Sequence, residues 1–200
     1  MSAERVLVIA CGALARELVR VRNLNDWDHL DIQCLPAEWH NTPQKIVPAV
    51  RRKIAENRAA YRTIFIGYAD CGTGGRLDAL IEEEGVRRLP GAHCYSFFAG
   101  AERFDRLVEA EIGTFYLTDY LAKNFDRLIV EGFGIDRHPE LKEMYFANYK
   151  KLVYLAQSED AEIDAKAEQA AAFLNLKYER VHTGDAPFES ALRQSVGRVA

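Results

Sequence analysis

The sequence lacks the features of several large classes of protein. No apolar stretch approaches the roughly 18 residues that suggest a membrane span. The first residues lack a signal-peptide pattern, so we expect a cytoplasmic protein that does not enter a membrane. Basic residues are not in excess, and the formal net charge of -4 argues against a nucleic-acid partner. Repeats and linkers are also missing, so the 200 residues predict a single domain over the whole chain.

Short apolar runs alternate with helical patterns along the chain. This alternation predicts an α/β fold in three layers, a Rossmann-like open sheet that is mainly parallel and has helices on both faces. We expect a helical insertion near 93–148, in which the aromatic run 113–120 is ambiguous. The predicted strands are 5–10, 31–35, 62–68, 86–89, 152–156 and 176–182, and the clearest helices are 13–22, 42–58 and 160–175.

Only four cysteines occur, and three of them follow predicted strands. Cys11 ends an apolar run, Cys71 follows the run 64–68, and Cys94 comes just after the run 86–89. Open α/β sheets gather ligands at the carboxyl ends of their strands. In a reducing compartment, dispersed cysteines are more often free thiols, metal ligands or nucleophiles than disulfides. The spacing matches no zinc-finger pattern, but three converging thiols would form a site for a soft metal.

One histidine and two glycines extend this candidate site. His40 follows the second predicted strand and completes a set of three sulfurs and one nitrogen, which suits zinc. Alternatively, His40 orients a substrate, shuttles protons or only hydrogen-bonds its own loop. Gly12 and Gly72 follow two of the cysteines, let the backbone turn sharply and would border the cofactor. Both cysteines are expected at helix N-termini, which lower the pKa of a thiol.

Further polar residues lie close to these cysteines in the sequence. Asp70 directly precedes one of them and would hydrogen-bond a metal-bound histidine or act as a base. His93 directly precedes another and would activate a cysteine nucleophile. Asp70 and His93 are therefore the candidate catalytic residues. Glu17 is expected on a solvated helix face, and Cys34 is expected to pack in the core.

Several motifs in this order resemble the domain-of-unknown-function 1638 family. They cover most of the chain and are Cys11-Gly12-x-Leu14-x-x-Glu17, Leu35-Pro36 with His40 and Pro43, Gly67-Tyr68-x-x-Cys71-Gly72, His93-Cys94, the run from Gly113 to Thr118, and Tyr145-x-x-Asn148-Tyr149. The resemblance implies an α/β fold and a cysteine-rich metal centre. It also implies an association with corrinoid-dependent methyl-transfer proteins, which would be partners.

Together, these features predict a metal-thiolate protein that acts on a small-molecule substrate. It would be an enzyme or accessory factor for methyl transfer or related chemistry in one-carbon metabolism, with zinc bound by Cys11, Cys71, Cys94 and His40. The same ligands would alternatively hold a [4Fe-4S] cluster with one open iron, suited to dehydration or sulfur removal. Two further alternatives are a non-catalytic module that delivers a metal or corrinoid and an enzyme with a cysteine nucleophile.

Overall fold

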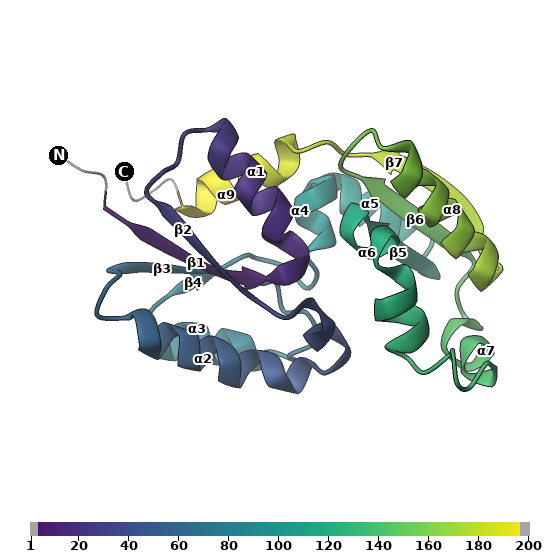
Figure 1. Cartoon of the computed structure of the whole chain (residues 1–200), viewed down its shortest axis with the longest axis horizontal. Helices are drawn as coiled ribbons and strands as arrows, with labels where there is room; N and C mark the ends of the chain where they lie inside the picture. The colour runs from purple at the N-terminus through teal and green to yellow at the C-terminus, as the bar shows by residue number, and fades with distance from the viewer. Residues whose placement is uncertain (1–3, 197–200) are drawn as a thin grey trace. The chain divides into compact units, whose positions relative to one another are not determined.

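The computed structural model describes residues 4–196 and divides them into two compact units. The first unit comprises 4–94 and 188–196, and the second comprises 95–187. Each contains a parallel sheet flanked by helices (Figure 1), so the α/β class is as predicted. The strands form two sheets, however, where the sequence predicted one sheet in a single domain.

The first unit contains a four-stranded sheet in the order β2-β1-β3-β4. All three strand pairs are parallel, and Cys11 at the end of β1 pairs with Leu35 at the end of β2. The carboxyl ends of the strands therefore meet at one edge of the sheet. The strands are β1 (Val6–Cys11), β2 (Leu30–Leu35), β3 (Thr63–Gly67) and β4 (Arg87–Arg88).

Helices cover both faces of this sheet because its central strand is apolar throughout. Every residue of β1 is buried, as expected for a strand enclosed on both faces. Figure 1 shows α1 on one face and α2 with α3 on the other. The helices are α1 (Ala15–Leu24), α2 (Ile46–Asn57), α3 (Arg76–Glu84) and most of α9 (Ala186–Val196). Short 3-10 helices cover Gly12–Leu14, Ala37–Asn41 and Pro43–Lys45.

The second unit contains a three-stranded parallel sheet in the order β5-β6-β7. Alternate residues of its strands face two different helical layers. Leu117 and Tyr154 belong to the apolar core shared with α8, whereas Tyr116 packs on Phe104 of α5. The strands are β5 (Thr114–Thr118), β6 (Lys151–Ala156) and β7 (Lys177–His182). The helices are α4 (Tyr95–Ala99), α5 (Ala101–Ala110), α6 (Asp119–Lys123), α7 (Glu140–Phe146) and α8 (Ala161–Leu174), with a π-helix at Asp126–Glu131.

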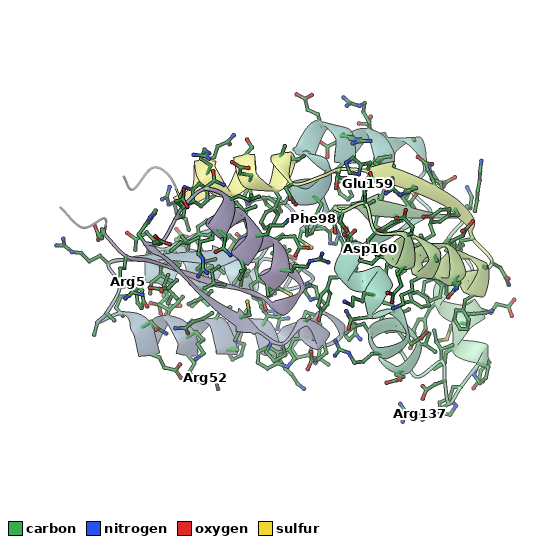
Figure 2. All side chains as sticks on the ribbon, turned by 45° about the horizontal axis from the view of Figure 1, so that its top comes forward. Arg5, Arg52, Phe98, Arg137, Glu159 and Asp160 are labelled. Carbon is green, nitrogen blue, oxygen red and sulfur yellow. The ribbon has the colours of Figure 1, made fainter. Side chains whose placement is uncertain are left out.

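The polar ends of the second unit's strands are held by local hydrogen bonds. Asp160 caps α8 by accepting from the amides of Glu162 and Ile163, at the position labelled in Figure 2. Buried Asp119 accepts hydrogen bonds from the Tyr154 hydroxyl, at 2.8 Å, and from two groups in the loop after β6. These hydrogen bonds hold the ends of β5 and β6 and the start of α8 in place.

Three sequence expectations need correction. The predicted helical insertion at 93–148 contains a strand, β5, in the aromatic run that was ambiguous. Cys34 is exposed rather than packed in the core, because β2 lies at the edge of its sheet. Glu17 is only 3% exposed, so it does not lie on a solvated face. None of the helices within residues 4–196 has both the length and the apolar character needed to cross a membrane.

Candidate thiol–imidazole site

Cys11 is the last residue of β1 and directly precedes the 3-10 helix Gly12–Leu14. Its Sγ accepts a hydrogen bond from the amide of Ala13 at 3.3 Å, so the thiol caps the 3-10 helix Gly12–Leu14. The side chain is buried. A Cβ at Gly12 would lie 3.0 Å from the carbonyl oxygen of Leu35, so glycine permits the turn to pass close to the end of β2. The end of β1 is thereby fixed against its neighbour.

His40 reaches the same point from the loop after β2. Its Nδ1 lies 2.9 Å from the carbonyl oxygen of Ala37 and 3.6 Å from Cys11 Sγ. Desolvation lowers the pKa of His40, but hydrogen bonds to Cys11 and Cys71 outweigh it and raise this pKa to about 11. The residue as a whole is exposed, so His40 lies where the cluster meets solvent.

Two neighbouring loops bring Cys71 and Cys94 together. The amide of Asp70 donates to the carbonyl of Gly91 at 3.1 Å, and that of Cys71 donates to the carbonyl of Ala92 at 3.0 Å. These bonds continue the pairing of β3 with β4 beyond both strands. Cys71 itself has a left-handed backbone, with φ of 49°, which is uncommon for a residue other than glycine.

Gly72 follows with a φ of 79°, so the chain makes two left-handed steps in succession. A side chain at Gly72 would be strained in this conformation, although space exists beside Pro43. Helix α3 begins only at Arg76, so Cys71 is not at a helix N-terminus as the sequence suggested. The sharp turn therefore positions the sulfur, and its electrostatic environment comes from neighbouring side chains.

The charges of the cluster are set by contacts between its members. A hydrogen bond from Cys94, followed by those from His40, lowers the pKa of Cys71 to about 5, although burial opposes this. The same contact with Cys71, together with burial, raises the pKa of Cys94 well above its ordinary value. In the metal-free protein, the cluster therefore holds a Cys71 thiolate beside a His40 imidazolium, with Cys94 as a neutral thiol.

Tyr68 is a residue of this site that the sequence analysis did not select. Its side chain is 1% exposed, and its ring stacks on that of His40 with the centroids 6.3 Å apart. Burial, followed by the charges of Cys11 and Cys71, raises the pKa of the Tyr68 hydroxyl, which remains protonated. The only sequence signal was its position at the end of β3, three residues before Cys71.

The two candidate catalytic residues lie differently from the cysteines. The Asp70 carboxylate accepts hydrogen bonds from Thr73 Oγ1 at 2.7 Å and from the amides of Gly75 and Gly74 at 2.9 and 3.1 Å. These bonds lower the pKa of Asp70, and its carboxylate interacts with groups of its own loop. His93 is exposed. The structure thus brings Cys11, His40, Cys71 and Cys94 together, whereas the Asp70 carboxylate faces its own loop.

The cluster is not preassembled around a metal ion. Over the described part of the chain, no group of three or more Cys, His, Asp or Glu side chains is arranged so that it could hold one. The thiols and the imidazole instead contact one another in pairs. A metal would require the side chains to turn toward a common point, which for cysteine involves rotation about a single bond.

Fold and site together define an α/β protein with a thiol–imidazole centre at the carboxyl edge of a parallel sheet. A model of the family described as "Protein of unknown function (DUF1638)" matches residues 34–192. The chain therefore belongs to that family. The matched range includes His40, Cys71 and Cys94, and it begins after Cys11. No curated protein and no solved structure matches the chain.

Proposed function

We propose that this protein binds a soft divalent metal ion, zinc, through Cys11, Cys71 and Cys94, with His40 as fourth ligand or neighbour. The observation that carries this proposal is the gathering of these four side chains from four separate segments of the first unit. Sulfur and imidazole donors in this number suit zinc. The bound metal would serve methyl transfer or related small-molecule chemistry, in an enzyme or an accessory factor.

The charge balance of the cluster supports a dication. Without metal, one imidazolium compensates one thiolate, and the raised pKa of Cys94 opposes a second thiolate. Three thiolates in one buried place require more positive charge than His40 provides. A dication would supply that charge and release protons from the thiols as it binds.

The hydrogen bonds of His40 fit a metal-binding role. In a neutral imidazole, Nδ1–H would donate to the carbonyl of Ala37, 2.9 Å away, and leave the lone pair of Nε2 available. This tautomer would also turn His40 from a charged partner of thiolates into a neutral ligand. If His40 stays a neighbour instead, the fourth position remains open to a substrate.

An open position on zinc can hold a substrate thiol as its thiolate or lower the pKa of bound water. In methyl transfer, the thiolate sulfur would form a bond to the methyl carbon while the carrier leaves with the electron pair of the broken bond. A corrinoid methyl-transfer protein would be the carrier, as the family resemblance suggests. The chain lacks the Asp-x-His-x-x-Gly cobalamin motif, so the corrinoid would reside on the partner.

Metal analysis of protein purified without air tests the proposal. We expect about one zinc per chain and its loss in Cys11→Ser, Cys71→Ser and Cys94→Ser. Cys34→Ser is the control, because Cys34 is an exposed thiol on the edge strand β2 and is not one of the proposed ligands; it should keep its metal. Metal content that survives all three cluster substitutions would reject the proposal. A brown protein with iron and inorganic sulfide would replace zinc with the [4Fe-4S] alternative.

A second candidate function is favoured by the backbone at Cys71. A thiolate on a sharp, left-handed turn four residues beyond the end of β3 resembles the strained turns that present catalytic nucleophiles. His40 would act as its activating partner. Activity that persists in chelator and disappears on alkylation of Cys71 would support this function over the metal. Activity lost in chelator and restored by zinc would exclude it.

A further inference from the structure

Two of the four cysteines are brought together by the backbone of neighbouring loops. Beyond the paired strands β3 and β4, the amide of Cys71 still donates to the carbonyl of Ala92 at 3.0 Å. In a parallel pair, such a bond places the residue after Ala92 opposite Cys71, so Cys94 is only one position further along. The backbone therefore keeps Cys71 and Cys94 close together without any ligand.

The sulfur atoms of these two residues are also in contact. The thiol of Cys94 is hydrogen-bonded to the sulfur of Cys71, and neither residue is in a disulfide. The Cys11 sulfur is engaged elsewhere, since it accepts from the amide of Ala13 at 3.3 Å and lies 3.6 Å from His40 Nδ1. Cys71 and Cys94 are therefore the pair best placed to form an S–S bond, which needs only a small approach of the two side chains.

We propose that Cys71 and Cys94 form a redox pair that hydrogen peroxide oxidises to a reversible intramolecular disulfide. The Cys71 sulfur bonds to one peroxide oxygen as the O–O bond breaks, and the other oxygen leaves as water with the thiol proton. The Cys94 sulfur then bonds to the Cys71 sulfur as the S–O bond breaks, and a second water leaves with the Cys94 proton. The two sulfurs give two electrons to peroxide, and a dithiol reductant returns them.

Burial of the pair limits the oxidant to a small molecule. Cys71 is only 8% exposed, and Cys94 is partly buried. Hydrogen peroxide is little larger than water and carries no charge. Glutathione disulfide is a charged peptide that must reach a sulfur directly in order to exchange with it. Peroxide should therefore oxidise the pair, whereas glutathione disulfide should not.

The redox pair belongs to the metal-free protein and does not depend on the proposed metal site. If a metal is bound, both sulfurs serve as thiolate ligands, so the metal and the disulfide exclude one another. Oxidation would then switch off metal binding. A protein that forms the disulfide but takes up no zinc would keep this inference and lose the proposed function.

Peptide mapping without reduction tests the inference on the full chain in chelator. Trypsin places Cys11, Cys34, Cys71 and Cys94 in separate peptides, which are 6–16, 23–45, 63–76 and 89–103. After peroxide treatment and alkylation of the remaining thiols, peptides 63–76 and 89–103 should be joined. Free thiols should fall from four to about two, and dithiothreitol should restore them. Peptides that stay separate, or a link through Cys11 or Cys34, would overturn the inference, and an equal yield with glutathione disulfide would overturn peroxide as the oxidant.

Two double variants with two cysteines each provide a matched comparison. Cys11→Ser/Cys34→Ser keeps only the proposed pair and should lose both thiols to peroxide; serine preserves the side-chain cap of the 3-10 helix Gly12–Leu14. Cys34→Ser/Cys71→Ser keeps Cys11 with Cys94, and these should remain unlinked. Equal linkage in both variants would contradict a specific pair.

A single variant tests the order of the two steps. Cys94→Ser removes the second thiol, so oxidation should stop at a sulfenic acid on Cys71, which dimedone traps as an adduct on peptide 63–76. In wild-type protein the disulfide should form instead and the adduct should be weaker. No adduct on Cys71 in the variant would show that peroxide does not react there first, and the proposed reaction would fail.

Discussion

In metal-free protein, the Cys71 thiol is expected to ionise far below the pH range of ordinary cysteines. The contacts with Cys94 and His40 place its pKa at about 5, compared with roughly 8.5 for a free cysteine. At pH 5.5, about three quarters of Cys71 would then be thiolate, against about 0.1% of an ordinary thiol. The thiolate fraction of Cys71 is therefore already high at a pH where an ordinary cysteine is almost fully protonated.

Alkylation by iodoacetamide in chelator, followed by mass spectrometry of each cysteine peptide, measures this ionisation. The midpoint of the pH profile is the informative quantity, because a thiolate of low pKa is also a weaker nucleophile and rates at pH 7 partly cancel. Cys34 in the same chain is the internal reference. Although the residue as a whole is exposed, partial desolvation of its thiol, with the charge of Cys11, raises the pKa of Cys34, so its alkylation should rise only in alkali.

Two variants identify the cause of the shift. Cys94→Ala should raise the midpoint of Cys71 most, because the hydrogen bond from Cys94 is the largest influence, and His40→Asn should raise it less. A wild-type midpoint near that of an ordinary cysteine would refute the reasoning. A wild-type midpoint near 5 that neither variant moves would refute the assigned cause.

The stability of the metal-free protein should depend on these two groups in opposite directions. The pKa of Cys71 is lower in the folded than in the unfolded chain, so its contribution is lost as pH falls through about 5. The pKa of His40 is raised from 6.5, so its contribution is present below 6.5 and lost as pH rises through about 11. The Cys71 contribution is complete only above the pKa of an unfolded cysteine, roughly 8.5. Urea unfolding should therefore show stability that rises from pH about 5 to 6.5, is level up to roughly pH 8.5 and falls toward pH about 11.

Three other substitutions test the supports around the site. Asp70→Ala removes the acceptor of three loop hydrogen bonds and should cost about 1–3 kcal/mol in urea unfolding, with metal content retained. Gly72→Ala places a side chain at a φ of 79° and should cost about 1–2 kcal/mol; no loss would contradict the left-handed turn. Asp119→Ala leaves buried donors unpaired in the second unit and should cost at least about 3 kcal/mol, while an unchanged Cys71 alkylation profile shows the first unit intact.

The fold class and the approach of the cysteines could be predicted from local patterns. The run Val6–Cys11 is apolar at every position, and the structure buries all of it in a parallel strand. Since parallel strands end at one edge, the strand-end positions of Cys11 and Cys71 already indicated that they would lie close together. Their role as metal ligands stays a prediction.

The division into two sheets could not be predicted in the same way. Hydrophobic periodicity identifies a strand but does not say which strand it pairs with. The run from Gly113 to Tyr120 is rich in aromatic residues, and its secondary structure depends on the strand with which it pairs. Thr114–Thr118 pairs with Lys151–Ala156 far along the chain, which turns an ambiguous segment into the first strand of a second sheet.

The sequence also gave wrong predictions for the burial of two side chains, because burial depends on residues that are distant in the sequence. Glu17 looked like a solvated helix residue, yet it is buried. Cys34 looked like a core residue, yet it lies on an edge strand and is exposed. Tyr68 gave no chemical signal in the sequence, because a tyrosine at a strand end is ordinary until its ring is found stacked on His40.

The first unit is built from two segments of the chain, and the whole second unit lies between them in the sequence. Helix α9 joins residues that left the ribosome long before it, and Arg193 lies over the Trp27 ring, with its guanidinium carbon 5.0 Å from the ring centroid. This contact closes a loop that contains the whole second unit, and long-range closure of this kind slows folding. During synthesis, the second unit can therefore be complete while the first still awaits its last helix, and thiols of the unfinished part would remain open to oxidants in the interval.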